Sequence, residues 1–112
     1  MARPKKSYRL SHKDLRKINL LVSQGKYQKA VKILKRGLPI SGVLHELRQM
    51  SSDQARAAHL AGNWPAVVMH LEAYRTLAKQ YRTACLVNDN QEPQEHTPED
   101  QALLDQARAH VW

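Results

Sequence analysis

The chain has no phenylalanine, a single cysteine and only four glycines among its 112 residues. Because Cys85 has no second cysteine to pair with, no disulfide can form within the chain, a cysteine usage typical of cytoplasmic proteins. No apolar run approaches the length that crosses a bilayer. We therefore expect a cytoplasmic protein with no membrane partner and one modest hydrophobic core.

Motifs of enzyme chemistry are also missing. The six histidines never stand three or four residues from one another or from Cys85, which is the spacing that helical zinc sites commonly use. The sequence has no glycine-rich phosphate loop, nucleophile elbow or HExxH motif. The adjacent carboxylates Glu99 and Asp100 stand where the start of a helix explains them. We therefore predict no enzyme activity, no cofactor, no metal and no small-molecule substrate.

Signals for β-strands are scarce, whereas signals for helices are abundant. No segment alternates apolar and polar residues over the length of a strand, and Ala, Leu, Lys, Gln and Arg are plentiful. Helical spacing of apolar residues predicts an all-α fold of five helices. These form two consecutive antiparallel hairpins and a short C-terminal helix, over residues 11–24, 26–38, 42–61, 63–87 and 98–111.

Residues that favour helix ends stand at the expected boundaries. Ser, Thr and Asn side chains accept hydrogen bonds from first-turn N–H groups, and glycine adopts the left-handed conformation that ends many helices. The expected N-caps are Ser11, Ser41, Asn63 and Thr97, and the expected terminating glycines are Gly25 and Gly62.

These elements divide the chain into four parts. Residues 1–9 are expected to form a flexible basic arm, and residues 10–87 a four-helix domain of two hairpins. The polar segment 88–97 is expected to be a linker, and residues 98–112 an acidic C-terminal helix. The spacing in this last helix predicts burial of Ala102, Leu103, Ala107 and Val111, which leaves Leu104 and Trp112 as expected contacts for a protein partner.

Acidic residues are nearly absent from the first third of the chain. Residues 1–39 hold twelve Lys and Arg but one acid, Asp14, whereas residues 88–112 hold one basic residue and six acids. Helical spacing in segment 25–39 places apolar residues on one face and only basic charges on the other, although solvated helices usually mix both signs. This polarity favours an anionic partner, most commonly nucleic acid.

We therefore predict non-catalytic, electrostatic binding of DNA or RNA, alone or within a nucleoprotein complex. An ordinary solvated surface is the alternative that needs no partner. A base-reading helix-turn-helix is a narrower alternative, in which Gln28 and Arg36 are the only candidates for base contacts. The predicted nucleic-acid-binding residues are Arg3, Lys5, Lys6, Arg9, Lys13, Arg16, Lys17, Lys26, Lys29, Lys32, Lys35 and Arg36.

Two segments of the chain are similar to each other. GKYQKAVKIL, which begins at Gly25, aligns with GNWPAVVMHL, which begins at Gly62. With a glycine and an aromatic residue at the turn and the small residue Ala30 inside the following helix, the pattern resembles the tetratricopeptide repeat. The resemblance implies stacked helical hairpins and a protein-binding groove. The alternative function is therefore a protein-interaction adaptor, inhibitor or chaperone that does not bind nucleic acid.

Overall fold

The computed structural model describes residues 10–111, which form six α-helices and, within that range, no strand. The predicted all-α class is confirmed, but the number of helices was wrong. The helices are α1 (His12–Ser23), α2 (Tyr27–Leu34), α3 (Ile40–Leu60), α4 (Trp64–Gln80), α5 (Arg82–Asp89) and α6 (Pro98–Val111).

The extra helix arises because the helix expected over residues 63–87 is interrupted at Tyr81. The backbone there has φ −102° and ψ 9°, outside the helical region, so α5 leaves the direction of α4. No proline or glycine marks this break in the sequence, which is why the spacing of apolar residues did not reveal it. The bend allows α5 to pack against α3.

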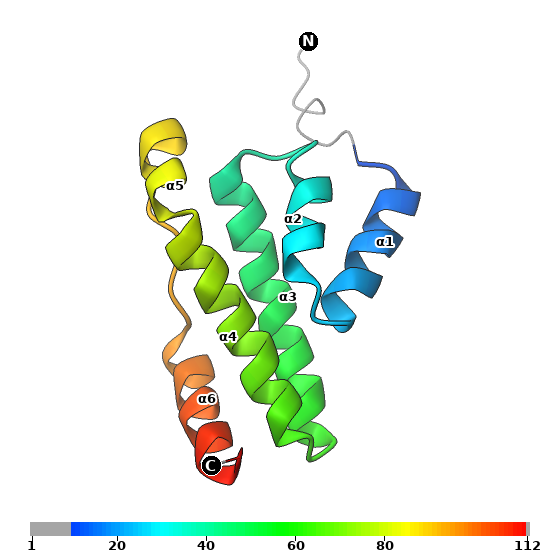
Figure 1. Cartoon of the computed structure of the whole chain (residues 1–112), viewed down its shortest axis with the longest axis vertical. Helices are drawn as coiled ribbons and strands as arrows, with labels where there is room; N and C mark the ends of the chain where they lie inside the picture. Colours follow the sequence, from blue (N-terminus) through cyan, green and yellow to red (C-terminus); the bar gives the residue numbers. More distant parts are fainter. Residues whose placement is uncertain (1–9, 112) are drawn as a thin grey trace.

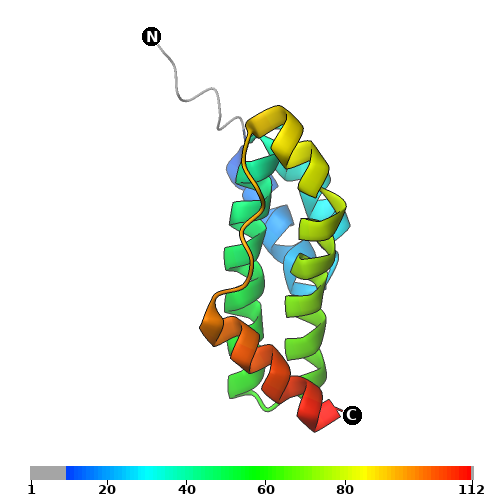
Figure 2. The same ribbon diagram turned by 90° about the vertical axis from the view of Figure 1, so that its left-hand side faces the viewer.

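The long antiparallel pair α3 and α4 forms the centre of the molecule (Figure 1). The shorter antiparallel pair α1 and α2 packs on one side of it, and α6 lies along α4 on the other side. Segment 90–97, which links α5 to α6, runs lengthwise over the central pair (Figure 2). Among the helices of the described range, none is long and apolar enough to span a membrane.

Two hydrophobic clusters divide the interior. The first joins α1, α2 and α5 to the first half of α3 and the second half of α4, and includes Ile18, Val31, Leu44 and Leu77. The second joins α6 to the opposite ends of α3 and α4, where its buried members are Ala55, Val67, Leu71, Leu104 and Ala107. The α3–α4 pair therefore contributes to both clusters, and the other helices pack against it.

The turns after α1 and α3 have the same geometry. Gly25 and Gly62 have φ +79° and +73°, the left-handed conformation that was predicted for both. In each turn the glycine N–H and the following N–H donate back to carbonyls of the preceding helix, which satisfies its last acceptors. These donor–acceptor pairs are Gly25–Val22, Lys26–Leu21, Gly62–His59 and Asn63–Ala58. The wider tetratricopeptide-like arrangement stays a prediction.

Three of the four expected N-caps are confirmed. The side chains of Ser11, Asn63 and Thr97 accept hydrogen bonds from N–H groups three residues later. The prediction for Ser41 was wrong, because α3 already begins at Ile40. The Ser41 N–H instead donates to the Asp89 carboxylate at 2.7 Å, so a side chain from α5 caps α3.

Candidate nucleic-acid interface on the first hairpin

Helix α2 has one buried face and one basic face. Tyr27, Ala30, Val31 and Leu34 are buried, as their spacing predicted. Ile33 is also buried, which the spacing did not predict, because α2 packs on α1 as well as on the central pair. The helix ends at Leu34 rather than at residue 38, so the last predicted basic residues lie in the turns that follow it.

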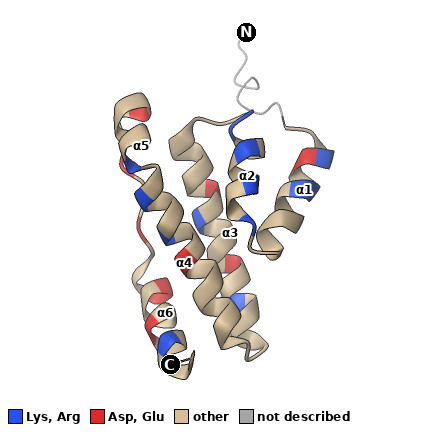
Figure 3. Ribbon diagram, in the orientation of Figure 1, with Lys and Arg blue, Asp and Glu red and all other residues tan. Residues whose placement is uncertain are grey.

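All eight predicted binding residues within the described range are exposed. They lie on α1, in the turn between α1 and α2, on α2, and in the turn after α2, as the blue positions in Figure 3 show. Four predicted residues, Arg3, Lys5, Lys6 and Arg9, lie outside the described residues. The exposed residues are Lys13, Arg16, Lys17, Lys26, Lys29, Lys32, Lys35 and Arg36.

One contact links the basic ends of the two helices. The Arg36 guanidinium lies 3.8 Å from the Asp14 carboxylate, and Asp14 also accepts a hydrogen bond from the Ser11 N–H in the capping box of α1. The end of α2 therefore lies beside the start of α1. Within residues 10–111, the other seven basic residues of this hairpin form no ion pair.

The two candidates for base contacts are both engaged inside the chain. The Gln28 side-chain amide donates to the Gln80 side-chain oxygen of α4 at 2.7 Å, and Arg36 pairs with Asp14. Helix α2 also has only eight residues. The groups that this hairpin leaves for a ligand are thus six lysines and Arg16, and a lysine offers a point charge with little sequence information.

A buried polar contact holds α2 against the central pair. The Tyr27 hydroxyl lies 2.8 Å from Nδ1 of His70 on α4, and the two rings meet edge to face. Burial raises the pKa of Tyr27 and lowers the pKa of His70, so the tyrosine keeps its proton and the imidazole is held neutral. This contact fixes the first turn of α2. The sequence analysis missed it because the partners are 43 residues apart.

The first helix is less buried than its apolar residues suggest. Ile18 and Val22 are buried, but Leu20 is 57% exposed and Leu15 is 43% exposed. The helical spacing of Leu15, Ile18, Leu21 and Val22 predicts one buried stripe, and this prediction was wrong for Leu15. The reason is that α1 packs mainly on α2 and only at its edge on α3, so one narrow face of the helix reaches the core.

The prediction that Leu104 contacts a protein partner needs correction. Leu104 is fully buried among residues of α3 and α4, while Ala102, which was expected to be buried, is exposed. The other expected contact, Trp112, lies outside the described residues. The reason is that α6 buries a different face from the one that its apolar spacing predicted. The Asp100 side chain is also buried on this face and lies 3.5 Å from Arg56 of α3.

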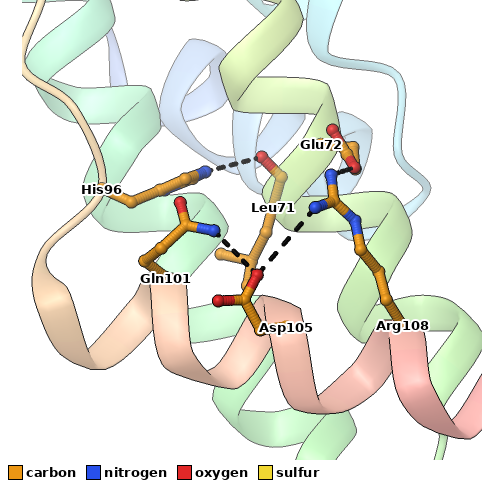
Figure 4. Close-up of polar contacts among 6 residues, drawn as sticks. All are labelled: Leu71, Glu72, His96, Gln101, Asp105 and Arg108. Carbon is orange, nitrogen blue, oxygen red and sulfur yellow. Dashed lines mark hydrogen bonds and ion pairs between the residues drawn. The ribbon is translucent and has the colours of Figure 1, made fainter.

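Polar contacts complete the docking of α6 and of the segment before it (Figure 4). Arg108 pairs with Glu72 of α4, and the Gln101 amide donates to Asp105 within α6. The His96 ring lies with Nε2 3.0 Å from the Leu71 carbonyl oxygen. The acidic helix therefore docks on the second hairpin and does not cover the basic one.

No other group in the described range forms an evident reactive centre. Cys85 is buried, and this burial raises the pKa of its thiol, with Asp89 adding to the shift. Among residues 10–111, no group of three His, Cys, Asp or Glu side chains could hold a metal ion. Comparisons with protein-family models, with curated proteins and with solved structures found no match to this chain.

Proposed function

We propose that this chain is a non-catalytic nucleic-acid-binding protein that holds phosphates on its N-terminal residues and on the hairpin of α1 and α2. The observation that carries the proposal is the set of seven exposed Lys and Arg side chains on this hairpin that have no carboxylate partner among the described residues. Surface cations are usually balanced by nearby acids, whereas this hairpin has one acid, Asp14, which pairs with Arg36 (Figure 3).

The charge arrangement on α2 supports an anionic ligand. Lys29 and Lys32 are three residues apart on α2, and Lys35 follows at the same interval directly after the helix, so like charges are neighbours along this surface. Such neighbours repel one another in the free protein. A phosphate backbone would relieve this repulsion and release its own counterions, so binding should be strongly salt-dependent.

The geometry favours contacts with phosphates over reading of bases. Gln28 and Arg36 already have partners inside the chain, whereas the lysines do not. The adaptor alternative has lost support in one respect, because the buried Leu104 is not available to a partner protein.

The test is a fluorescence anisotropy titration of the full chain with single- and double-stranded DNA and RNA. If seven phosphates are contacted, affinity should fall on the order of a thousandfold or more between about 50 and 200 mM salt. Lys32→Glu should weaken binding to every sequence to a similar extent and reduce the salt slope.

The matched control is the double variant Gln106→Glu with Ala109→Glu, which changes the net charge by the same two units at exposed positions of α6, the helix that docks on the second hairpin. It should alter affinity much less than Lys32→Glu. Weak binding at low salt, or equal losses in the two variants, would contradict the proposed interface.

A further inference from the structure

A cleft of about 360 Å³ lies on the side of α4 that faces away from α1 and α2. Its walls come from the second half of α4, from the segment that links α5 to α6, and from the first turn of α6. The volume is at the lower end of the range for small-molecule sites. The charged and polar wall residues include Tyr74, Arg75, Lys79, Arg82, Glu95 and His96.

Three cations line one wall of this cleft. Arg75 and Lys79 are four residues apart on one face of α4, and Arg82 begins α5 directly after the break at Tyr81. Arg82 is already bound to Glu92, through hydrogen bonds of 3.1 and 2.5 Å from its Nε and one terminal nitrogen. Arg75 is half-buried and Lys79 is exposed, and neither has an ion-pair partner in the part of the chain that the structure describes.

The opposite wall supplies acceptors of hydrogen bonds. Glu95 contributes a carboxylate, and His96 contributes an imidazole whose Nε2 lies 3.0 Å from the Leu71 carbonyl oxygen. A carbonyl only accepts, so Nε2 carries the proton and Nδ1 is an acceptor. Nδ1 is buried and has no hydrogen-bond partner among the described residues. Burial also lowers the pKa of His96, which favours this neutral form.

The two walls differ in the ligand groups that they suit. A guanidinium and an ammonium one turn apart suit a phosphate group, to which arginine can donate two parallel hydrogen bonds. A carboxylate and an imidazole acceptor suit hydroxyl groups, as an acidic residue does when it binds a ribose. Nδ1 is closed to solvent in the free protein, so the imidazole ring has to turn toward the cleft before a ligand hydroxyl can give Nδ1 the donor that it lacks.

We propose that this cleft binds a small phosphorylated sugar, with its phosphate at Arg75 and Lys79 and its hydroxyl groups at Glu95 and His96. No small-molecule substrate was predicted from the sequence, because no known motif marks this cleft, which forms where α4 and the start of α5 meet segment 90–97 and the first turn of α6. The proposal concerns binding and assigns no reaction. It is independent of the nucleic-acid interface, since the two sites lie on opposite sides of the α3–α4 pair.

An NMR titration of the full chain with ribose 5-phosphate tests the proposal. We expect saturable binding of ribose 5-phosphate. Ribose should bind with an affinity at least about tenfold lower, because it lacks the charged group that Arg75 and Lys79 would bind. Arg75→Gln with Lys79→Gln should cause a similar loss. Lys29→Gln with Lys32→Gln removes the same charge from α2 and should leave the affinity within about twofold. Thermal unfolding checks that each variant is folded. If Arg75→Gln disturbs the fold, the single variant Lys79→Gln, at an exposed site, serves as the test and should weaken binding.

Two further titrations identify the source of the phosphate. Inorganic phosphate should bind more weakly than ribose 5-phosphate, and equal affinity would overturn the assignment of the hydroxyl-binding wall. A 5′-phosphorylated oligonucleotide should not displace ribose 5-phosphate from the cleft more effectively than its 5′-hydroxyl counterpart. Preferential displacement would assign the cleft to a nucleic-acid end instead. Absence of saturable binding, or equal losses in the two double variants, would overturn the proposal as a whole.

Discussion

The Tyr27 hydroxyl and His70 Nδ1 lie 2.8 Å apart inside the protein and join the first turn of α2 to the middle of α4. The tyrosine holds its proton, so the hydroxyl donates and the neutral imidazole accepts. A buried contact thus holds α2 in place, and its acceptor is a histidine, the residue whose unperturbed pKa lies close to physiological pH.

Acid should destabilise the fold through His70. Burial lowers its pKa in the folded state below the ordinary value of 6.5, so the unfolded chain binds more protons between those two values. The contribution of His70 to stability is therefore fully present above about pH 6.5 and is lost as the pH drops below that value. Urea unfolding at pH 8 and pH 5 measures the difference. The free energy of unfolding should be lower at pH 5.

His70→Asn is the variant that separates this effect from general acid destabilisation. It should reduce the change in stability between the two pH values while leaving some, because burial also lowers the pKa of His96 with the same sign. An identical pH dependence in the wild type and the variant would show that His70 does not contribute.

Removal of the Asp89 side chain should destabilise the protein through the start of α3. Its carboxylate accepts the Ser41 N–H at 2.7 Å, in place of the usual cap from the same helix. Loss of such a cap costs about 1 kcal/mol, so Asp89→Ala should lower the free energy of unfolding by that amount in urea. The control is Asp53→Ala, which removes an exposed carboxylate from α3 that has no ion pair within residues 10–111 and should change stability less. Equal effects of the two substitutions would argue against the cap.

Truncation of Leu104 should release α6 from the central pair. Leu104 is fully buried among Ala55, Val67 and Leu71, and Leu→Ala changes at such sites cost about 2–5 kcal/mol. Leu104→Ala should therefore lower the thermal midpoint and speed proteolysis in segment 90–97. Leu60→Ala, at a site that is 89% exposed, should change stability by less than about 0.5 kcal/mol. Resistance of Leu104→Ala to both challenges would contradict the docking of α6.

Much of the fold could be predicted because its signals are local. Capping side chains and the two left-handed glycines mark helix ends within a few residues of sequence, and they were located correctly at Ser11, Gly25, Gly62 and Thr97. The buried face of α3 also followed from its helical spacing. Of the five residues expected on that face, Leu44, Leu47, Ser51 and Ala55 are buried and Ala58 is half-buried.

The features that could not be predicted depend on contacts between distant residues. The break at Tyr81 lacks proline or glycine, and the cap at Ser41 comes from a residue 48 positions away. Helix α6 is turned so that Asp100 lies buried beside Arg56 and Leu104 faces α3 and α4, whereas a periodicity based on apolar residues alone assigned Leu104 to the outer face. For the candidate interface, exposure of the lysines followed from their pattern, whereas the pairing of Arg36 with Asp14 did not.

The division of the interior into two clusters has a consequence for motion. The clusters share α3 and α4, but α6 belongs to one of them and the basic hairpin to the other. Such units can open separately, each with its own free energy. Amide hydrogens of α6 can therefore exchange with solvent while α1 and α2 stay in place, so that a ligand held by the hairpin would leave the far end of the protein free to fluctuate.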